Sequence, residues 1–283
     1  MTTDQLVERL LDLALEEDVA TGDLTTNAII PARSRARATL TARAPGVVSG
    51  LAIAPRVFAR LDPSTRWQSL VADGERVNKG DIIARVDAHY RALLTGERVA
   101  LNILQRMSGI ATATAAHVQA LEGSGARLLD TRKTAPGMRV LDKMAVAHGG
   151  GQNHRMGLHD MILIKDNHIK IAGGIPAAAR QARACLSPGV QMEIETANLD
   201  EVQQALDAGA DIIMLDNMTT EEMARAVRLI NRRARVEASG NMTLERLAEV
   251  AATGVDYISA GALTHSVAAL DISMNIEETT EGQ

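Results

Sequence analysis

The sequence predicts an α/β protein in which an N-terminal α/β sandwich domain, half-barrel-like in its strand pattern, is followed by an incomplete parallel α/β barrel. Short alternating runs over residues 34–87 predict antiparallel strands. Beyond Gly174, apolar runs alternate with amphipathic helices at intervals of roughly twenty residues, as in βα units that form a parallel sheet. We therefore expect a first domain over residues 1–108, joined by the C-terminal tail 270–283, and a barrel over residues 109–269.

Composition and charge restrict the function classes. The chain has 283 residues and 46% hydrophobic residues, which supply a sizeable core, but only 1% aromatic residues. Scarce aromatic side chains and a formal net charge of -5 are unlike nucleic-acid binders, which use stacking platforms and basic surfaces. No signal-like or membrane-spanning apolar run is present, so we expect a cytoplasmic protein with neither nucleic-acid nor membrane partners. The single cysteine, Cys185, excludes an intramolecular disulfide, and its apolar helical surroundings predict a buried thiol.

The first domain is predicted to begin with an amphipathic helix. Thr2 and Gln5 form a capping-box pair at its start. Its apolar face is expected to contain Leu6, Leu10, Leu13 and Ala14. Strands are then predicted for the runs RARATLTAR, VVSGLAI and DIIARVD, with turns between them.

A long helix is predicted between Tyr90 and Ala120, because apolar residues recur there at helical spacing. Arg98 and Arg106 lie off its apolar stripe. From the residues alone, Arg98 is an ordinary arginine on a helix surface.

The barrel strands end in polar or small residues. The runs RLLDT and MILI predict strands that are followed by Arg132, Lys133 and Lys165, and later strands end at Glu195, Asp216, Ser239 and Gly261. Strand ends of a βα barrel face the active-site rim. Two turns there can offer backbone N–H groups to a phosphate. They contain Ser239, Gly240 and Asn241 in the first case, and Gly261 and Ala262 in the second.

The segment from Asp130 to Ile169 concentrates cations and imidazoles beside a glycine run. Regularly spaced charges of alternating sign would indicate a solvated face, but these cations lie at glycine turns and at strand ends. This pattern favours an anionic ligand. The residues for which a functional role is predicted are Arg132, Lys133, His154, Arg155 and Lys165.

Three motifs in this segment, TRKT-x-PG-x-R, GGG-x-NHR-x-GL and LIKDNH, resemble the quinolinate phosphoribosyltransferase family. The resemblance extends from GDLTT at Gly22 to GALTHSVAALDIS near the C-terminus. It implies transfer of phosphoribosyl from phosphoribosyl diphosphate to quinolinate with decarboxylation. The products would be nicotinate mononucleotide, diphosphate and CO₂, in de novo NAD biosynthesis.

The resemblance also implies roles for the charged residues. Arg132 and Arg155 would bind the pyridine dicarboxylate, while Lys133, Lys165 and His154 would neutralise further negative charge. Glu195 and Asp216 would hold the Mg²⁺ of phosphoribosyl diphosphate, directly or through water or diphosphate, or contact the ribose. The expected catalytic residues are Lys133, Lys165, Glu195 and Asp216.

The family places the arginine that matches Arg98 in the active site of a neighbouring subunit. The resemblance therefore implies a homodimer, or a higher oligomer, with Arg98 shared across the interface.

Three alternatives stay open at this point. Lys165 at a strand end could form the Schiff base of a barrel aldolase, although the many arginines speak against it. A non-catalytic or molybdenum-associated paralogue would share the fold. The turn DGERVNKGD resembles lipoyl and biotinyl carriers, in which Lys79 would be acylated, but its neighbours Asn78 and Gly80 do not fit that signature.

Overall fold

The computed structural model of the protein describes residues 2–185 and 187–278. The chain forms two compact units. The first contains residues 1–115, 135–150 and 267–283, and the second contains residues 116–134 and 151–266. These units differ from the predicted division at residue 108 in two respects: the first unit continues to residue 115, and it includes the segment 135–150, which the prediction assigned to the barrel.

The first unit contains a four-stranded antiparallel sheet in the order β12-β1-β5-β3 and a two-stranded sheet of β2 and β4. Its strands are β1 (Arg35–Ala42), β2 (Gly46–Val47), β3 (Arg66–Ser69), β4 (Arg76–Val77), β5 (Ile82–His89) and β12 (Ile272–Glu278). Its helices are α1 (Thr3–Val19), α2 (Leu24–Ile29), α3 (Ala54–Leu61), α5 (Arg139–His148) and most of α4 (Tyr90–Ala120).

Alternation along β1 explains how this sheet covers its core. Ala36, Ala38, Leu40 and Ala42 are fully buried, while the residues between them lie on the other face. β12 pairs with β1, so the described part of the C-terminal tail belongs to this unit, as expected. Residues 279–283 of that tail lie outside the described residues.

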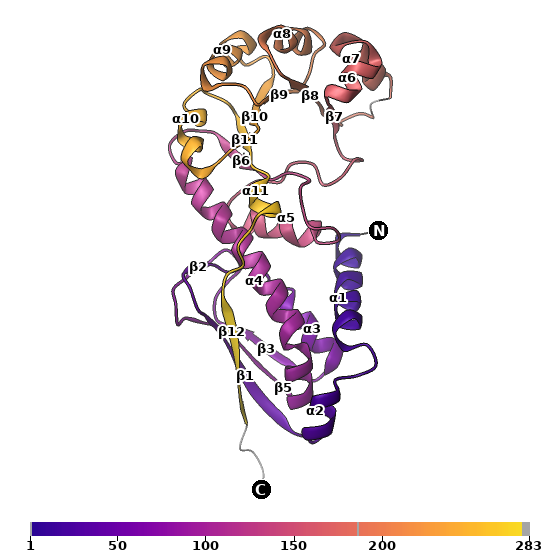
Figure 1. Cartoon of the computed structure of the whole chain (residues 1–283), viewed down its shortest axis with the longest axis vertical. Coiled ribbons are helices and arrows are strands. Elements are labelled where there is room, and N and C mark those ends of the chain that lie inside the picture. The colour runs from indigo at the N-terminus through magenta and orange to yellow at the C-terminus, as the bar shows by residue number, and fades with distance from the viewer. Residues whose placement is uncertain (1, 186, 279–283) are drawn as a thin grey trace. The chain divides into compact units, whose positions relative to one another are not determined.

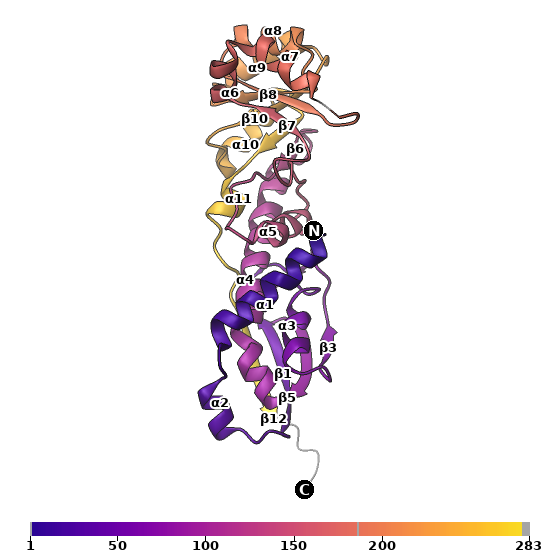
Figure 2. The ribbon, with the colours of Figure 1, turned by 90° about the vertical axis from the view of Figure 1, so that its right-hand side faces the viewer.

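Two local predictions for the first unit are wrong in part. The capping box of Thr2 and Gln5 is present, but α1 buries Val7 and Leu11, whereas Leu6 and Leu13 are exposed. The run VVSGLAI is not a strand beyond Val47. It leads into α3, whose arginines form ion pairs with acidic residues of α1, and Figure 2 shows the two helices beside each other.

The segment 135–150 joins the first unit because α5 is amphipathic. Val140, Leu141, Ala145 and Val146 are buried in the same core as the sheet residues of that unit. Arg106 of α4 also binds Asp142 of α5 through two hydrogen bonds of 2.8 Å. Sequence proximity to the barrel strands does not reveal this long-range packing.

The second unit is an open parallel sheet in the order β6-β11-β10-β9-β8-β7, with β6 and β7 at its edges. Its strands are β6 (Arg127–Leu129), β7 (Ile162–Ile164), β8 (Met192–Thr196), β9 (Ile212–Asp216), β10 (Arg235–Ser239) and β11 (Tyr257–Ser259). Its helices are α6 (Asp166–Ala172), α7 (Ile175–Ala184), α8 (Leu199–Asp207), α9 (Thr220–Ile230), η1 (Leu244–Arg246), α10 (Leu247–Ala251) and α11 (Ala262–His265).

Figure 1 shows helices α7 to α10 along the outer side of this curved sheet. The predicted incomplete α/β barrel is thereby confirmed, and so are the strands expected for QMEIET, DIIMLD, RVEAS and DYISAG.

The prediction that Cys185 has a buried thiol is wrong. The residue ends α7 and its thiol side chain is exposed, because the buried face of that helix is formed by Ile175, Ala178 and Ala179.

Candidate active site

A cavity of about 740 Å³ lies at the carboxyl ends of the parallel strands of the second unit. Twelve of the predicted rim residues and turn residues line it. They are Arg132, Lys133, His154, Arg155, Lys165, Glu195, Asp216, Ser239, Gly240, Asn241, Gly261 and Ala262. The sequence-based grouping of these residues at one rim therefore agrees with the geometry of the fold.

Arg98 is the one predicted site residue that does not line this cavity. It lies on α4 in the first unit, where its side chain is 61% exposed and its guanidinium is 3.7 Å from the Glu97 carboxylate. Within one chain it is a surface arginine.

Two arginines form the most cationic part of the cavity. The Nε atom of Arg132 is buried and has no hydrogen-bond partner among the described residues. Arg155 donates from Nη1 to the Met161 carbonyl at 3.2 Å. Burial lowers the pKa of Arg155, and repulsion by Arg132 lowers it further. Two guanidinium groups that repel each other in a half-buried cavity are suited to a ligand with two carboxylates.

Two carboxylates lie at the ends of the neighbouring strands β8 and β9. Glu195 is 3.5 Å from Lys165 Nζ, and Asp216 accepts a hydrogen bond of 2.7 Å from the side-chain amide of Asn217. Burial raises the pKa of Glu195; the Lys165 charge opposes this rise, and the Asp216 charge adds to it. The two carboxylates therefore interact electrostatically, and a cation between them would relieve their repulsion.

The two glycine turns have close side-chain neighbours. Gly240 has a φ of +95°, and a Cβ atom there would lie 2.2 Å from Oδ1 of Asn217. Arg246 donates to the Gly240 carbonyl at 3.3 Å and to the Met218 carbonyl at 3.1 Å, which ties the loops after β9 and β10 together. The turn with Gly261 is tied to the other side of the rim, because Thr264 donates to the Lys133 carbonyl at 2.8 Å.

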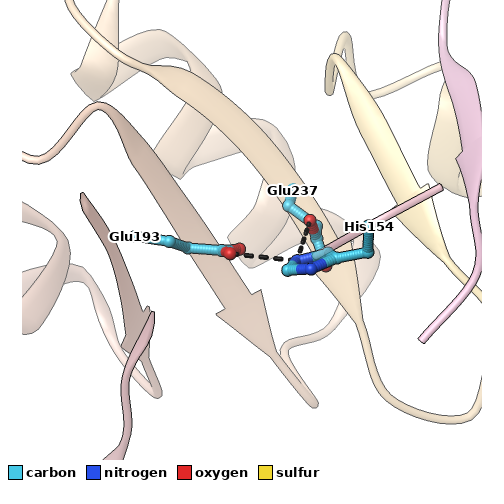
Figure 3. A group of neighbouring side chains, drawn as sticks. All are labelled: His154, Glu193 and Glu237. Carbon is cyan, nitrogen blue, oxygen red and sulfur yellow. Dashed lines mark ion pairs between the residues drawn. The ribbon is translucent and has the colours of Figure 1, made fainter. Parts of the chain in front are cut away.

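Sequence reasoning missed four residues of this region. Asn217 and His265 line the cavity, and so does Glu237. Figure 3 shows the carboxylates of Glu193 and Glu237 both directed at the imidazole ring of His154. The two glutamates were overlooked because they lie inside strands, two residues before the strand-end positions Glu195 and Ser239. The period of two along a strand is the signal that could have found them.

The surroundings of His154 bear on its predicted role. Its Nε2 atom lies 3.0 Å from Glu193 and 3.4 Å from Glu237, and its side chain is only 8% exposed. Burial by itself would lower the pKa of His154, but the hydrogen bonds to and the charges of the two carboxylates raise it to about 10. Burial and the Glu237 charge raise the pKa of Glu193. His154 thus lines the cavity while its Nε2 atom faces two buried carboxylates, and its predicted role in neutralising substrate charge stays a prediction.

No helix in residues 2–185 and 187–278 is long and apolar enough to cross a membrane.

Comparisons with known proteins cover both units. Residues 23–108 match the sequence model of the N-terminal domain of quinolinate phosphoribosyl transferase, and residues 110–275 match that of its C-terminal domain.

Relatives of known name cover nearly the whole chain. A Synechocystis protein named probable nicotinate-nucleotide pyrophosphorylase (carboxylating) is 45% identical over 274 residues, which are 96% of this chain and 92% of the relative. A Nicotiana glauca protein named quinolinate phosphoribosyltransferase (decarboxylating) 1 is 45% identical over 95% of this chain and 81% of its own.

Solved structures of similar proteins also cover nearly the whole chain. The crystal structure of NadC from Streptococcus pyogenes is 42% identical, with a TM-score of 0.93 and 99% coverage of both chains. The nicotinate-nucleotide pyrophosphorylase structure from Francisella tularensis is 39% identical, with a TM-score of 0.92 and 98% coverage of both chains.

Proposed function

The chain belongs to the quinolinate phosphoribosyltransferase family, and from this premise we propose how its barrel rim binds two anionic substrates and joins them. The protein is a phosphoribosyltransferase of NAD biosynthesis. It transfers the phosphoribosyl group of phosphoribosyl diphosphate to quinolinate with decarboxylation, and it forms nicotinate mononucleotide, diphosphate and CO₂. The relatives do not favour a Schiff-base aldolase or a non-catalytic paralogue.

The observation that carries the assignment of residues is that the predicted cations and carboxylates line one and the same cavity. In this proposal Arg132 and Arg155 bind the two carboxylates of quinolinate, because planar guanidinium groups match carboxylates in pairs of hydrogen bonds. Lys133 and Lys165 neutralise the charge that remains on the dicarboxylate and the diphosphate.

Phosphoribosyl diphosphate occupies the opposite side of the rim in this proposal. The turns with Ser239, Gly240 and Asn241 and with Gly261 and Ala262 offer backbone N–H groups to a phosphate. Glu195 and Asp216 are suited to Mg²⁺, since this ion typically uses one or two carboxylates together with substrate phosphates. When bound, Mg²⁺ would neutralise the diphosphate leaving group.

The chemistry then needs no protein nucleophile. The ring nitrogen of quinolinate attacks C1 of the ribose, and the bond from C1 to diphosphate breaks. The carboxylate at C2 of the pyridine is then lost as CO₂, and C2 takes up a proton. The rim residues align the reactants, and Glu195 and Asp216 stabilise the positive charge that develops on the ribosyl carbon.

We propose that a second copy of the chain supplies Arg98, so that the active unit is a homodimer with two shared sites. The support is the exposure of Arg98 and its absence from the cavity of its own chain. Arg98→Ala and Arg132→Ala homodimers should both be inactive. A heterodimer of the two has one intact site and should recover about half the wild-type activity per dimer. Inactive verified heterodimers would contradict sharing.

The proposed function is tested with purified protein, quinolinate, phosphoribosyl diphosphate and Mg²⁺, by detection of nicotinate mononucleotide and of CO₂. Chelation of Mg²⁺ should abolish turnover reversibly, because two carboxylates otherwise face a negative diphosphate. Nicotinate serves as the parallel substrate. Turnover of nicotinate but not of quinolinate would overturn the substrate assignment, and full activity in chelator would overturn the metal role.

We also propose that the protein is cytoplasmic, in keeping with its single cysteine.

A further inference from the structure

His154, Glu193 and Glu237 form a buried group of three residues within the barrel. Glu193 on β8 and Glu237 on β10 are fully buried, and both carboxylates approach Nε2 of the imidazole (Figure 3). Glu193 precedes Glu195 by two residues, so it lies on the same face of β8, one layer deeper than the rim. The proposed function does not use either deep glutamate.

The hydrogen bond at the other ring nitrogen indicates where the imidazole proton is. The backbone N–H of Arg155 donates to Nδ1 of His154 at 2.7 Å. This contact uses the Nδ1 lone pair of the neutral ring, whereas the two carboxylates raise the His154 pKa and favour a second proton on the ring. In both protonation states Nε2 carries a proton, which faces the two carboxylates. Both ring nitrogens of His154 are then occupied within the protein, and a substrate carboxylate would have to displace one of these contacts to reach a nitrogen.

The same proton position argues against a metal ion in this group. One ligand atom from each of the three residues lies within 4.8 Å of the others, a separation that a metal site could have. A metal ion at Nε2 would need the lone pair of that nitrogen. In metal-bound histidines the other ring nitrogen usually donates a hydrogen bond, whereas Nδ1 of His154 accepts one.

His154 also connects the segment 152–155 to several strands. Its backbone N–H donates to the buried Asp130 carboxylate at 2.8 Å, and the Asp130 N–H donates to the Gln152 carbonyl at 3.1 Å. The ring reaches β8 and β10 through the two glutamates. Arg155 follows His154 directly, so the backbone from which its guanidinium extends is held from both sides. The Glu193 charge partly offsets the lowering of the Arg155 pKa by burial and by Arg132.

We propose that Glu193 and Glu237 are positioning residues that fix the His154 ring, and through it hold Arg155 in the geometry that binds a carboxylate of quinolinate. This inference rests on the proposed function. Arg155 is the residue that touches the substrate, while the glutamates act on it through the imidazole and through their negative charge. Loss of their support should weaken quinolinate binding and leave the phosphoribosyl diphosphate side of the rim intact.

The experiment compares graded substitutions. Glu237→Gln and Glu193→Gln keep an oxygen that can accept the Nε2 proton, whereas Glu237→Leu removes both acceptor and charge. Since a misplacement of about 1 Å can cost about 100-fold, we expect the KM for quinolinate to rise about tenfold in Glu237→Leu and about threefold in the glutamine variants. The KM for phosphoribosyl diphosphate should stay within about twofold of the wild-type value.

Asp62→Asn is the matched control, because Asp62 is a buried carboxylate of the first unit, 4% exposed, and has no part in the rim. It should lower stability without changing either KM. Thermal unfolding shows which variants are folded, and calorimetry with phthalate, a non-reacting aromatic dicarboxylate, measures binding without turnover.

The possible outcomes distinguish a failure of the proposed function from a failure of the positioning role. A wild-type protein that neither converts quinolinate nor binds it would refute the proposed function. If wild type binds and the folded glutamate variants bind equally well, or if both KM values rise together, the positioning role is wrong. It is also wrong if the wild-type protein carries one equivalent of a metal ion that the glutamate variants lose, because the group would then be a metal site.

Discussion

Substitution of Gly240 by alanine tests whether the turn after β10 is built around Asn217. The new Cβ would lie 2.2 Å from the Asn217 side-chain oxygen, about 1.3 Å closer than an ordinary contact. Asn217 has little room to move, since its amide binds Asp216 at 2.7 Å and its backbone N–H donates to the Ser239 carbonyl at 3.0 Å. The clash should cost about 1–3 kcal/mol. A φ of +95° adds about 1–2 kcal/mol for a residue with a side chain.

The shift of Asn217 should pull Asp216 with it, so the KM for phosphoribosyl diphosphate should rise at least about tenfold. The KM for quinolinate should change little. Gly254→Ala is the matched control, because Gly254 has a φ of +91° but its added Cβ would meet only Val227, at 3.4 Å. Urea unfolding and steady-state kinetics of both variants are the measurements. Equal stability losses with unchanged kinetics in both variants would refute the clash argument.

Three further predictions follow from individual contacts. Burial alone would raise the pKa of Asp62, but hydrogen bonds from Ser64 and His89 hold it well below its usual value, so its stabilisation is complete above about pH 4 and disappears on further acidification. Asp62→Asn should therefore flatten the pH dependence of the urea midpoint below pH 4, and an unchanged slope would contradict this. Arg246→Met should raise the KM for phosphoribosyl diphosphate about threefold in a folded protein, and an unaltered KM would show that the tie between the loops is dispensable. Arg106→Met leaves the fully buried Asp142 without its guanidinium and should cost about 3–5 kcal/mol in urea unfolding, most of which an added Asp142→Leu should restore.

Patterns of short range predicted much of the fold. The βα rhythm located the strands and helices from β8 to β11, and helical spacing gave α4 between Tyr90 and Ala120. The helix α3 was missed because the mostly apolar run VVSGLAI just before it resembles a strand, although the proline in APRVFARL lies at a helix start. The face of α1 was misplaced because leucines recur on two sides of it, and only the tertiary partners decide that Val7 and Leu11 are buried.

The rim residues could be predicted because a barrel brings strand ends together whatever the sequence between them. The deep residues could not. Glu193 and Glu237 lie 44 positions apart on different strands, and their common partner His154 lies in a loop. The proposed role of Arg98 could not be tested in the same way, because the contacts of one copy of the chain show only an exposed arginine.

The pairing of β12 with β1 has a consequence for the synthesis of the protein. Roughly 240 residues separate the start of β1 from the start of β12, and at about 5–20 residues per second the ribosome needs about 10–50 s to produce them. During that time one edge of β1 has no native neighbour and can recruit a wrong strand. The N-terminal sheet can thus be completed only after β12 has been synthesised, and nascent chains stalled before Ile272 should need chaperones more than chains that contain β12.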